Sequence, residues 1–251
     1  MGRVRAATAF LAAAVIFFFG VQLAAQGKGQ AKAARRVVVE SDGWKLVCDL
    51  LVPKSKRPAP AVILLNKAAG DRRAYEQLAR SLAEHGIASL RVDLRGHGES
   101  INKGKFVPGS ENALSVIEGS DEDVTSAFGY LKTVPGIDAR KIGFVGASYS
   151  GEEMAVSARK HGYGQAYVAL SPGSFSDESM EAIDPSGVPW LFVKSTAERA
   201  KSLQDFFALL RRKSRTAQTM EVVGTEHATD VLSAHPELAE MLAVWFKHQL
   251  R

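Results

Sequence analysis

The sequence predicts a single α/β domain in which helices cover both faces of a mostly parallel sheet. From about residue 36 onward, short apolar segments typical of buried strands alternate with amphipathic segments typical of helices. The chain has 251 residues, of which 46% are hydrophobic and 24% charged, so it has the size and composition of a globular protein with a substantial core. The pattern contains no internal repeat and no boundary of a second domain.

Positive charge is concentrated at the start of the chain. Residues 1–36 contain six of the 32 Lys and Arg residues and no acidic residue. The formal net charge of +5 becomes −1 without these six residues, so the remainder gives little support to a nucleic-acid-binding face. The single cysteine, Cys48, excludes an intrachain disulfide, and no cluster of metal ligands or phosphate-loop spacing appears. We therefore expect no nucleic-acid partner, no metal and no cofactor.

The first 27 residues have the order of a secretory signal peptide. Two early arginines precede an apolar run over residues 10–21, and small residues follow it. This basic, apolar and small-residue order predicts a signal peptide over residues 1–27, cleaved after Ala25 or Gly27. We expect the mature protein to be exported, either to a periplasm or to the medium.

An uncleaved membrane anchor is the alternative for the same segment. Residues 6–25 match the length of about 20 residues that spans a bilayer, although Thr8 and Gln22 weaken the span. Contact with a membrane is expected only if the segment stays uncleaved. Residues 28–36 are small and basic and form a linker, and residues 37–251 form the folded domain.

The domain begins with a predicted hairpin. Residues 36–40 and 44–52 are strand-like, and the Ser-Asp-Gly sequence between them is a turn signal. Residues 61–66 are almost wholly apolar, as in a buried parallel strand.

Helix and strand then alternate. Residues 72–85 have helical spacing and stop at Gly86, which is a common helix-terminating residue. Residues 87–93 form the next strand, and a long loop over 94–119 leads to a helix over 120–133.

The second half of the domain repeats this alternation and completes a sheet of eight strands. Four further strands are predicted at 141–146, 166–170, 188–194 and 219–223. Three further helices are predicted at about 149–161, 199–213 and 236–250.

A serine stands at the sharp junction between one predicted strand and the following helix. The sequence there is small–x–Ser–x–small, with Gly146 before Ser148 and Ser150 after it. Such a turn forces the serine backbone into a strained conformation, so its neighbours two positions away must be small. The following helix directs its first amides at the site, and the Tyr149 N–H is placed to donate to a developing oxyanion. An ordinary Gly/Ser-rich turn is the alternative.

With this motif, the chain resembles the α/β-hydrolase superfamily over nearly all of residues 37–251. Residues 93–100 and 134–142 resemble the superfamily's loop after the fourth strand and its approach to the nucleophile strand. The pattern is most similar to the lidless branch, with its dienelactone hydrolase-like and small serine esterase or peptidase-like members. The resemblance implies an α/β-hydrolase fold with a mostly parallel eight-stranded sheet and helices on both faces. It also implies that Asp93 and His97 brace turns near the site.

The resemblance implies a base and an acid that follow the nucleophile in the chain. His227 lies after the last predicted strand and before the last helix, where a loop can bring its imidazole over the serine. Glu198 stands four positions after residue 194, where the superfamily usually has an aspartate. A glutamate can orient a histidine as an aspartate does. Asp177, Glu178 and Asp184 remain alternatives for the acid.

The turn expected to complete the oxyanion hole departs from the superfamily. Where His-Gly is expected, the chain has Asn66 and Lys67, and Ala68 takes the position of the amide donor. Either the turn is altered and keeps the same amide geometry, or Lys67 favours an anionic substrate, or the hole is impaired.

These features together predict an exported serine hydrolase that cleaves short-chain carboxylic esters through an acyl-enzyme. Ser148 is the expected nucleophile, His227 the base and Glu198 the residue that orients it, with the amides of Tyr149 and Ala68 as the oxyanion hole. The expected partner is a small-molecule ester or acyl substrate. A peptidase or thioesterase of the same fold, or a non-catalytic binding protein, is the alternative.

Overall fold

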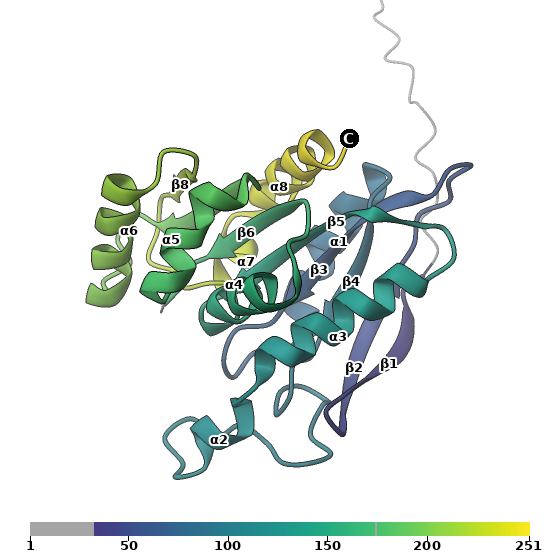
Figure 1. The fold of residues 1–251 in the computed structure, drawn as a ribbon, viewed down its shortest axis with the longest axis horizontal. Helices are drawn as coiled ribbons and strands as arrows, with labels where there is room; N and C mark the ends of the chain where they lie inside the picture. Colours follow the sequence, from purple (N-terminus) through teal and green to yellow (C-terminus); the bar gives the residue numbers. More distant parts are fainter. Residues whose placement is uncertain (1–32, 174) are drawn as a thin grey trace, which may run out of the picture.

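The computed structural model describes residues 33–173 and 175–251 (Figure 1). The predicted signal peptide or anchor and most of the predicted linker lie outside the described residues. Over the ranges that are described, no helix has the length and apolar character needed to cross a membrane.

Eight strands form one sheet. They are β1 (Arg35–Ser41), β2 (Trp44–Leu51), β3 (Ala59–Leu65), β4 (Ala88–Val92), β5 (Ile137–Ala147), β6 (Ala166–Leu170), β7 (Trp190–Ser195) and β8 (Gln218–Val222). Their order across the sheet is β1-β2-β4-β3-β5-β6-β7-β8. The β1–β2 and β2–β4 pairs are antiparallel and every other pair is parallel. The mostly parallel, eight-stranded sheet predicted from the sequence is therefore confirmed.

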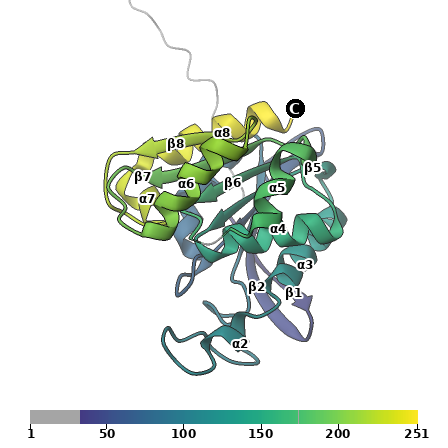
Figure 2. The same ribbon diagram turned by 60° about the vertical axis from the view of Figure 1, so that its left-hand side comes forward.

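Helices cover both faces of this sheet. They are α1 (Glu76–Glu84), α2 (Ala113–Ile117), α3 (Ser120–Thr133), α4 (Tyr149–His161), α5 (Asp177–Ser186), α6 (Lys201–Lys213), α7 (Asp230–Ala234) and α8 (Pro236–Gln249), with a 3₁₀ turn (Arg72–Tyr75) before α1. One face carries α3, α4, α5 and α6, and the other carries α1, α7 and α8 (Figures 1 and 2). Each face has its own hydrophobic core, with Phe144 and Phe192 in one and Val145 and Val193 in the other.

Strand β5 starts earlier than the sequence predicts. It begins at Ile137, whose partner on β3 is Ala59, and the register shifts before the next pair. The first residues of β5 include Arg140, which is exposed and paired with Asp138 by a 3.1 Å contact. Because a strand end without an apolar face shows no alternating pattern, sequence periodicity could not locate it.

The sequence did not predict three short helices, which are α2, α5 and α7, and α5 shows why. The Ser176 hydroxyl caps this helix by accepting a hydrogen bond from the Ser179 N–H at 3.1 Å. Pro185 lies in the last turn, where a proline is usually taken as the end of a helix. Met180 and Ile183 are buried in the core, so α5 is an integral part of the fold.

The loop after β4 is braced by a buried carboxylate, in the region where the resemblance implies bracing. Asp93 accepts hydrogen bonds from the N–H groups of Arg72 at 2.7 Å and Glu99 at 2.9 Å, and it pairs with the Arg72 guanidinium. His97 stacks between Phe106 and Tyr149, with ring centroids 5.0 and 5.5 Å away. These contacts hold the loop beside the first residue of α4.

Candidate active site

The junction between β5 and α4 has the geometry that the sequence motif requires. Ser148 lies between the two elements with φ 55° and ψ −120°, a conformation that residues other than glycine rarely adopt. A Cβ atom at Gly146 would lie only 2.6 Å from the carbonyl oxygen of Ser150. The Ser150 hydroxyl accepts a hydrogen bond from the Ala147 N–H at 2.8 Å, which fixes the turn from the other side. The serine is thus held at the start of a helix by its small neighbours.

The structure brings Ser148, His227 and Glu198 into one chain of contacts. The Ser148 Oγ lies 3.0 Å from Nε2 of His227, and the His227 Nδ1 contacts Oε1 of Glu198. Since a carboxylate only accepts, the Nδ1–H of a neutral His227 donates to Glu198 and leaves Nε2 free to accept from Ser148. This arrangement can take a proton from the serine hydroxyl.

The three residues follow different strands but meet at one edge of the sheet. Ser148 follows β5, Glu198 follows β7 and His227 follows β8, and the carboxyl ends of parallel strands meet at the same edge. The Glu198 side chain is only 5% exposed, whereas the His227 side chain is 42% exposed. The carboxylate is therefore shielded from water while the imidazole remains open to a substrate.

The alternative acids are not brought to His227. Asp184 accepts hydrogen bonds from Ser214, Thr216 and the N–H of Arg215, and these contacts lower its pKa to about 2, the Ser214 hydroxyl contributing most. Asp177 and Glu178 lie exposed in the first turn of α5. Of the four candidates, Glu198 is the one in contact with the imidazole.

The altered turn after β3 does not need glycine at position 67. The Gly70 N–H donates to the carbonyl of Lys67 at 3.0 Å, and the left-handed backbone lies at Ala69, with φ 57°. The buried Asn66 side chain accepts from the Leu94 N–H and donates to the Lys67 carbonyl, each at 2.8 Å. Asn66 therefore ties this turn to the end of β4.

The Lys67 side chain is paired rather than isolated. Its Nζ lies 2.5 Å from Oδ2 of Asp230, in the first turn of α7. An ion pair of this kind reduces the positive potential that Lys67 would otherwise present to a substrate, so the geometry gives little support to the anionic-substrate interpretation.

A hollow of about 510 Å³ reaches Gly173, a close neighbour of the nucleophile. It is lined by Glu152, Gly173, Phe175, Ser176, Ser202, Asp205, Phe206 and Leu209. A Cβ atom at Gly173 would lie 3.6 Å from the Ser148 Oγ, so this glycine keeps the approach to the serine open. The lining combines aromatic rings with acidic groups.

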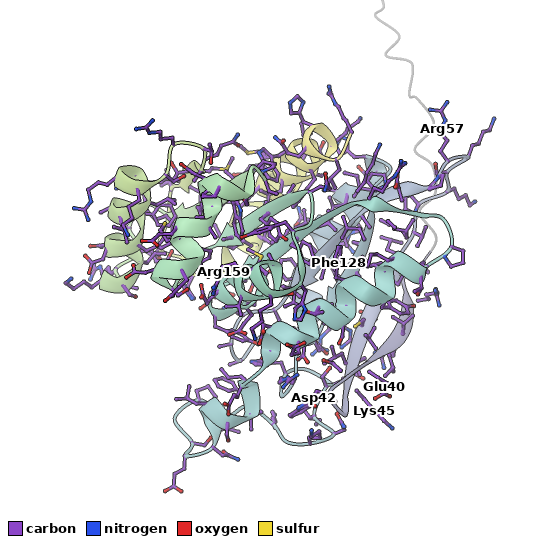
Figure 3. All side chains as sticks on the ribbon, in the orientation of Figure 1. Glu40, Asp42, Lys45, Arg57, Phe128 and Arg159 are labelled. Atoms are coloured by element: carbon purple, nitrogen blue, oxygen red, sulfur yellow. The ribbon has the colours of Figure 1, made fainter. Side chains whose placement is uncertain are left out.

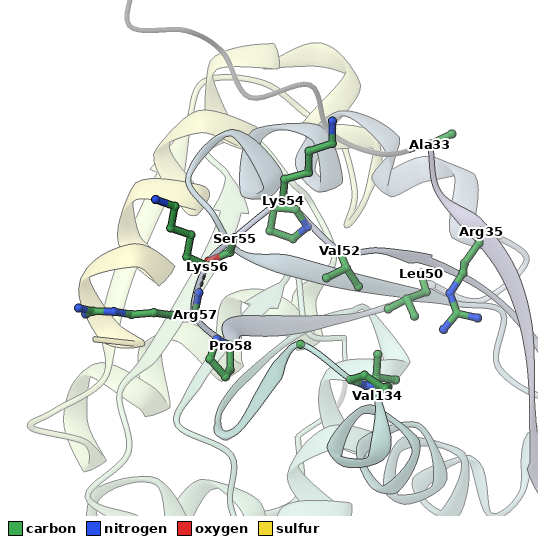
Figure 4. Close-up of a pocket in the computed structure, with 13 residues that line it drawn as sticks. Ala33, Arg35, Leu50, Val52, Lys54, Ser55, Lys56, Arg57, Pro58 and Val134 are labelled. Carbon is green, nitrogen blue, oxygen red and sulfur yellow. Dashed lines mark hydrogen bonds between the residues drawn. The ribbon is translucent and has the colours of Figure 1, made fainter.

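A larger hollow, of about 700 Å³, lies at the other edge of the sheet, where β2 ends and β3 begins (Figure 4). Its lining includes Arg35, Lys54, Lys56 and Arg57. Arg57 lies at the end of the domain opposite the hairpin turn that Asp42 marks (Figure 3). Its lining residues Pro58 and Gly136 precede β3 and β5, whereas Ser148, Glu198 and His227 follow their strands. This hollow is therefore separate from the candidate active site.

Residues 42–250 match the family model for the X-Pro dipeptidyl-peptidases of the S15 family. The chain belongs to the S15 family. Membership places the chain in the α/β-hydrolase superfamily, as the sequence motifs predict, and makes it a hydrolase of the esterase or peptidase type.

Solved structures with the same fold as this S15-family chain include esterases. A dienelactone hydrolase from Anabaena variabilis superposes with a TM-score of 0.68 at 18% identity, covering 88% of this chain and 100% of its own. Est1E from Butyrivibrio proteoclasticus, solved with ferulic acid bound, gives 0.65 at 19% identity, covering 83% and 98%. An esterase from Pyrococcus furiosus gives 0.65 at 13% identity, covering 87% and 91%. No curated protein matches the chain.

Helix α4 of the S15-family chain carries a carboxyl group with a raised pKa, Glu153, about one helical turn after Ser148. Burial, together with the charges of Asp121 and Glu152, raises the pKa of Glu153 to about 7. In the unfolded chain this carboxyl loses its proton near its ordinary pKa of 4.5. The folded protein therefore binds this proton more tightly than the unfolded chain does. As a result, Glu153 lowers the free energy of unfolding progressively as the pH rises from 4.5 toward 7, and the whole loss persists above pH 7.

Glu153→Gln is accordingly expected to stabilise the protein at pH 8, by up to about 3 kcal/mol, and to have little effect near pH 4.5. Urea unfolding of both proteins at these two pH values measures the difference. The exposed Glu111→Gln is the control and should change stability little at either pH. An effect of Glu153→Gln that is equal at pH 4.5 and pH 8 would contradict the assignment.

Proposed function

We propose that this S15-family hydrolase is a serine hydrolase that cleaves short-chain carboxylic esters. The observation that carries the proposal is the 3.0 Å contact between the Ser148 Oγ and His227 Nε2, made by a serine held at φ 55° at a strand–helix junction. A serine hydroxyl is a weak nucleophile unless an adjacent base accepts its proton, and this contact supplies one.

In the proposed reaction, the Ser148 Oγ attacks the acyl carbonyl as His227 Nε2 accepts the hydroxyl proton. The negative charge develops on the carbonyl oxygen, toward which the N–H groups of Tyr149 and Ala68 donate. The tetrahedral intermediate collapses to an acyl-enzyme, and His227 passes its proton to the departing alkoxide. A water molecule then repeats the sequence: His227 accepts its proton, the hydroxide attacks the acyl carbon, and the proton returns to Ser148 as the acid leaves.

Glu198 serves as the third member of the proposed triad. Its contact with Nδ1 holds the imidazole ring in the orientation that points Nε2 at Ser148. Its charge stabilises the imidazolium that forms when His227 takes the serine proton, because the 5% exposed carboxylate interacts with little screening by water.

The substrate proposed is a short, soluble ester. The segment between β6 and β7 contains only α5 and its connections. Since α5 buries Met180 and Ile183 in the core, it does not form a cap over the site. The rate for p-nitrophenyl butyrate should therefore exceed that for a long-chain ester. The rate for the long-chain ester should not rise abruptly above its critical micelle concentration, and such a rise would contradict the proposal.

A peptidase is the second candidate, and the family match favours it. The same residues can cleave an amide, but the leaving amine must be protonated by His227 as the bond breaks. Parallel assays with p-nitrophenyl acetate and an X-Pro p-nitroanilide separate the two. A larger kcat/KM for the anilide than for the ester would assign the protein as a peptidase.

Export is proposed from the sequence of residues 1–27, with its basic start, apolar centre and small residues. N-terminal sequencing of the protein recovered from outside the cytoplasm of its host should begin between Gln26 and Gln30. Recovery of the intact chain from the membrane fraction would establish the anchor instead.

A further inference from the structure

Ser171 is a buried serine directly after β6 that the reaction above does not use. Its side chain lies away from solvent, with 1% of the residue exposed, and its N–H continues the sheet by donating to the carbonyl of Val193 at 2.7 Å. Its position places the hydroxyl between the loop that carries Glu198 and the loop that carries His227.

The Ser171 hydroxyl is bonded to both of these loops. It donates a hydrogen bond to Oε2 of Glu198 at 2.8 Å and accepts a hydrogen bond from the Ala228 N–H at 3.1 Å. Oε2 is the carboxylate oxygen that His227 does not contact, since His227 contacts Oε1. A buried carboxylate requires such donors, because burying a charged group without hydrogen-bond partners is costly.

The backbone of Ser171 is strained, which argues that the side chain is needed. Its φ of 42° lies in the left-handed region, where glycine is accommodated without steric conflict and serine is not. A residue that served only to turn the chain after β6 would be better as glycine. The hydroxyl offers what glycine lacks, namely one donor for the acid and one acceptor for the next loop.

We propose that Ser171 is a positioning residue for the hydrolytic reaction. It aims the Glu198 carboxylate at His227 Nδ1, and its bond with the Ala228 N–H holds Glu198 in place relative to the loop that carries His227. This inference rests on the proposed function, specifically on Glu198 as the acid of the triad.

The test compares Ser171→Ala with Ser171→Gly. Both remove the hydroxyl, so kcat for p-nitrophenyl butyrate should fall about tenfold to a hundredfold in each, with KM changed little. Glycine also relieves the backbone strain, so Ser171→Gly should unfold at a higher urea concentration than Ser171→Ala. The loss of kcat should thus be similar in both variants, because both lack the hydroxyl, whereas their stabilities should differ because only glycine relieves the backbone strain. A Ser171→Gly variant with wild-type kcat would overturn the proposal.

Ser157→Ala is the matched control. Ser157 is also buried, and its hydroxyl hydrogen-bonds to Thr125 at 2.8 Å between α3 and α4. Its replacement removes a serine hydroxyl of similar burial without touching Glu198 or His227, so kcat should stay near the wild-type value. An equal loss of kcat in Ser157→Ala and Ser171→Ala would mean that the effect is general and would also overturn the proposal.

A double-mutant cycle with Glu198→Gln then asks whether Ser171 acts through the carboxylate. If it does, adding Ser171→Ala to Glu198→Gln should lower kcat by less than about twofold further. Effects that multiply would show an independent role and would count against the inference. If Glu198→Gln lowers kcat but Ser171→Ala does not, the Ser171 assignment alone fails. If Glu198→Gln leaves kcat unchanged, the proposed acid fails, and the role of Ser171 fails with it.

Discussion

Ser148→Ala is expected to lower ester hydrolysis by at least about 10⁴-fold and to abolish labelling by a fluorophosphonate probe. The probe reacts with a serine that has a base within hydrogen-bond distance, as the Ser148 Oγ has at 3.0 Å from His227. Removing the hydroxyl deletes the attacking atom, so no acyl-enzyme can form. Mass spectrometry of the labelled wild-type protein should place the adduct on Ser148.

His227→Ala is the companion variant to this replacement. Labelling should fall severely, because an unassisted serine hydroxyl is a weak nucleophile at neutral pH. Both variants should fold, since neither replacement removes a large apolar side chain. A folded wild-type protein that takes no label and cleaves no small ester would contradict the proposal. Such a result would favour the non-catalytic binding protein, with an impaired turn at Asn66 and Lys67.

Glu198→Gln is expected to produce the second largest loss, a fall in kcat of about 10³- to 10⁴-fold with the fold retained. The neutral amide cannot stabilise the imidazolium, and it can present its NH₂ group to Nδ1, which favours the tautomer whose Nε2 carries the proton. Such a histidine cannot accept a proton from Ser148. Steady-state kinetics on p-nitrophenyl butyrate, with circular dichroism as the check on folding, measure the effect.

The competing assignment for the acid is tested by Asp177→Asn and Asp184→Asn. Neither should change kcat, because Asp177 lies exposed at the start of α5 and Asp184 bonds to the segment after α6. Unchanged kinetics in Glu198→Gln together with a loss in either of these variants would transfer the role of the acid to a residue of α5.

The sequence was most informative where a position along the chain also determines a position in space. The strand–helix junction required small residues around Ser148, and the spacing placed Glu198 and His227 after successive strands. Parallel strands direct their carboxyl ends to one edge of the sheet, so the loops that follow these strands lie near one another. Their proximity can be predicted without knowing any side-chain contact. The order of residues was therefore enough to name the three groups that the structure brings together.

The sequence was least informative where contacts between distant segments decide the outcome. The hydrogen bond that Asn66 accepts from Leu94 joins residues 28 positions apart, and the Ser171–Glu198 bond joins residues 27 positions apart. Neither bond leaves a periodic pattern. The left-handed backbone at Ala69 likewise follows from how the turn is anchored, since nothing in an Ala-Ala dipeptide requires it. Only the folded arrangement shows these features.

The order of strands has a consequence for how activity responds to small openings of the structure. Ser148 follows β5, which lies between β3 and β6, whereas His227 follows β8, an edge strand with Gln218, Thr219 and Glu221 exposed. Hydrogen-bonded on one side only, β8 should exchange its amide hydrogens sooner than β5 and detach at a lower energy than global unfolding. Such fraying would carry the imidazole away from the serine while the central strands stay folded. Inactivation by mild heat or denaturant would then be reversible and would precede loss of the core.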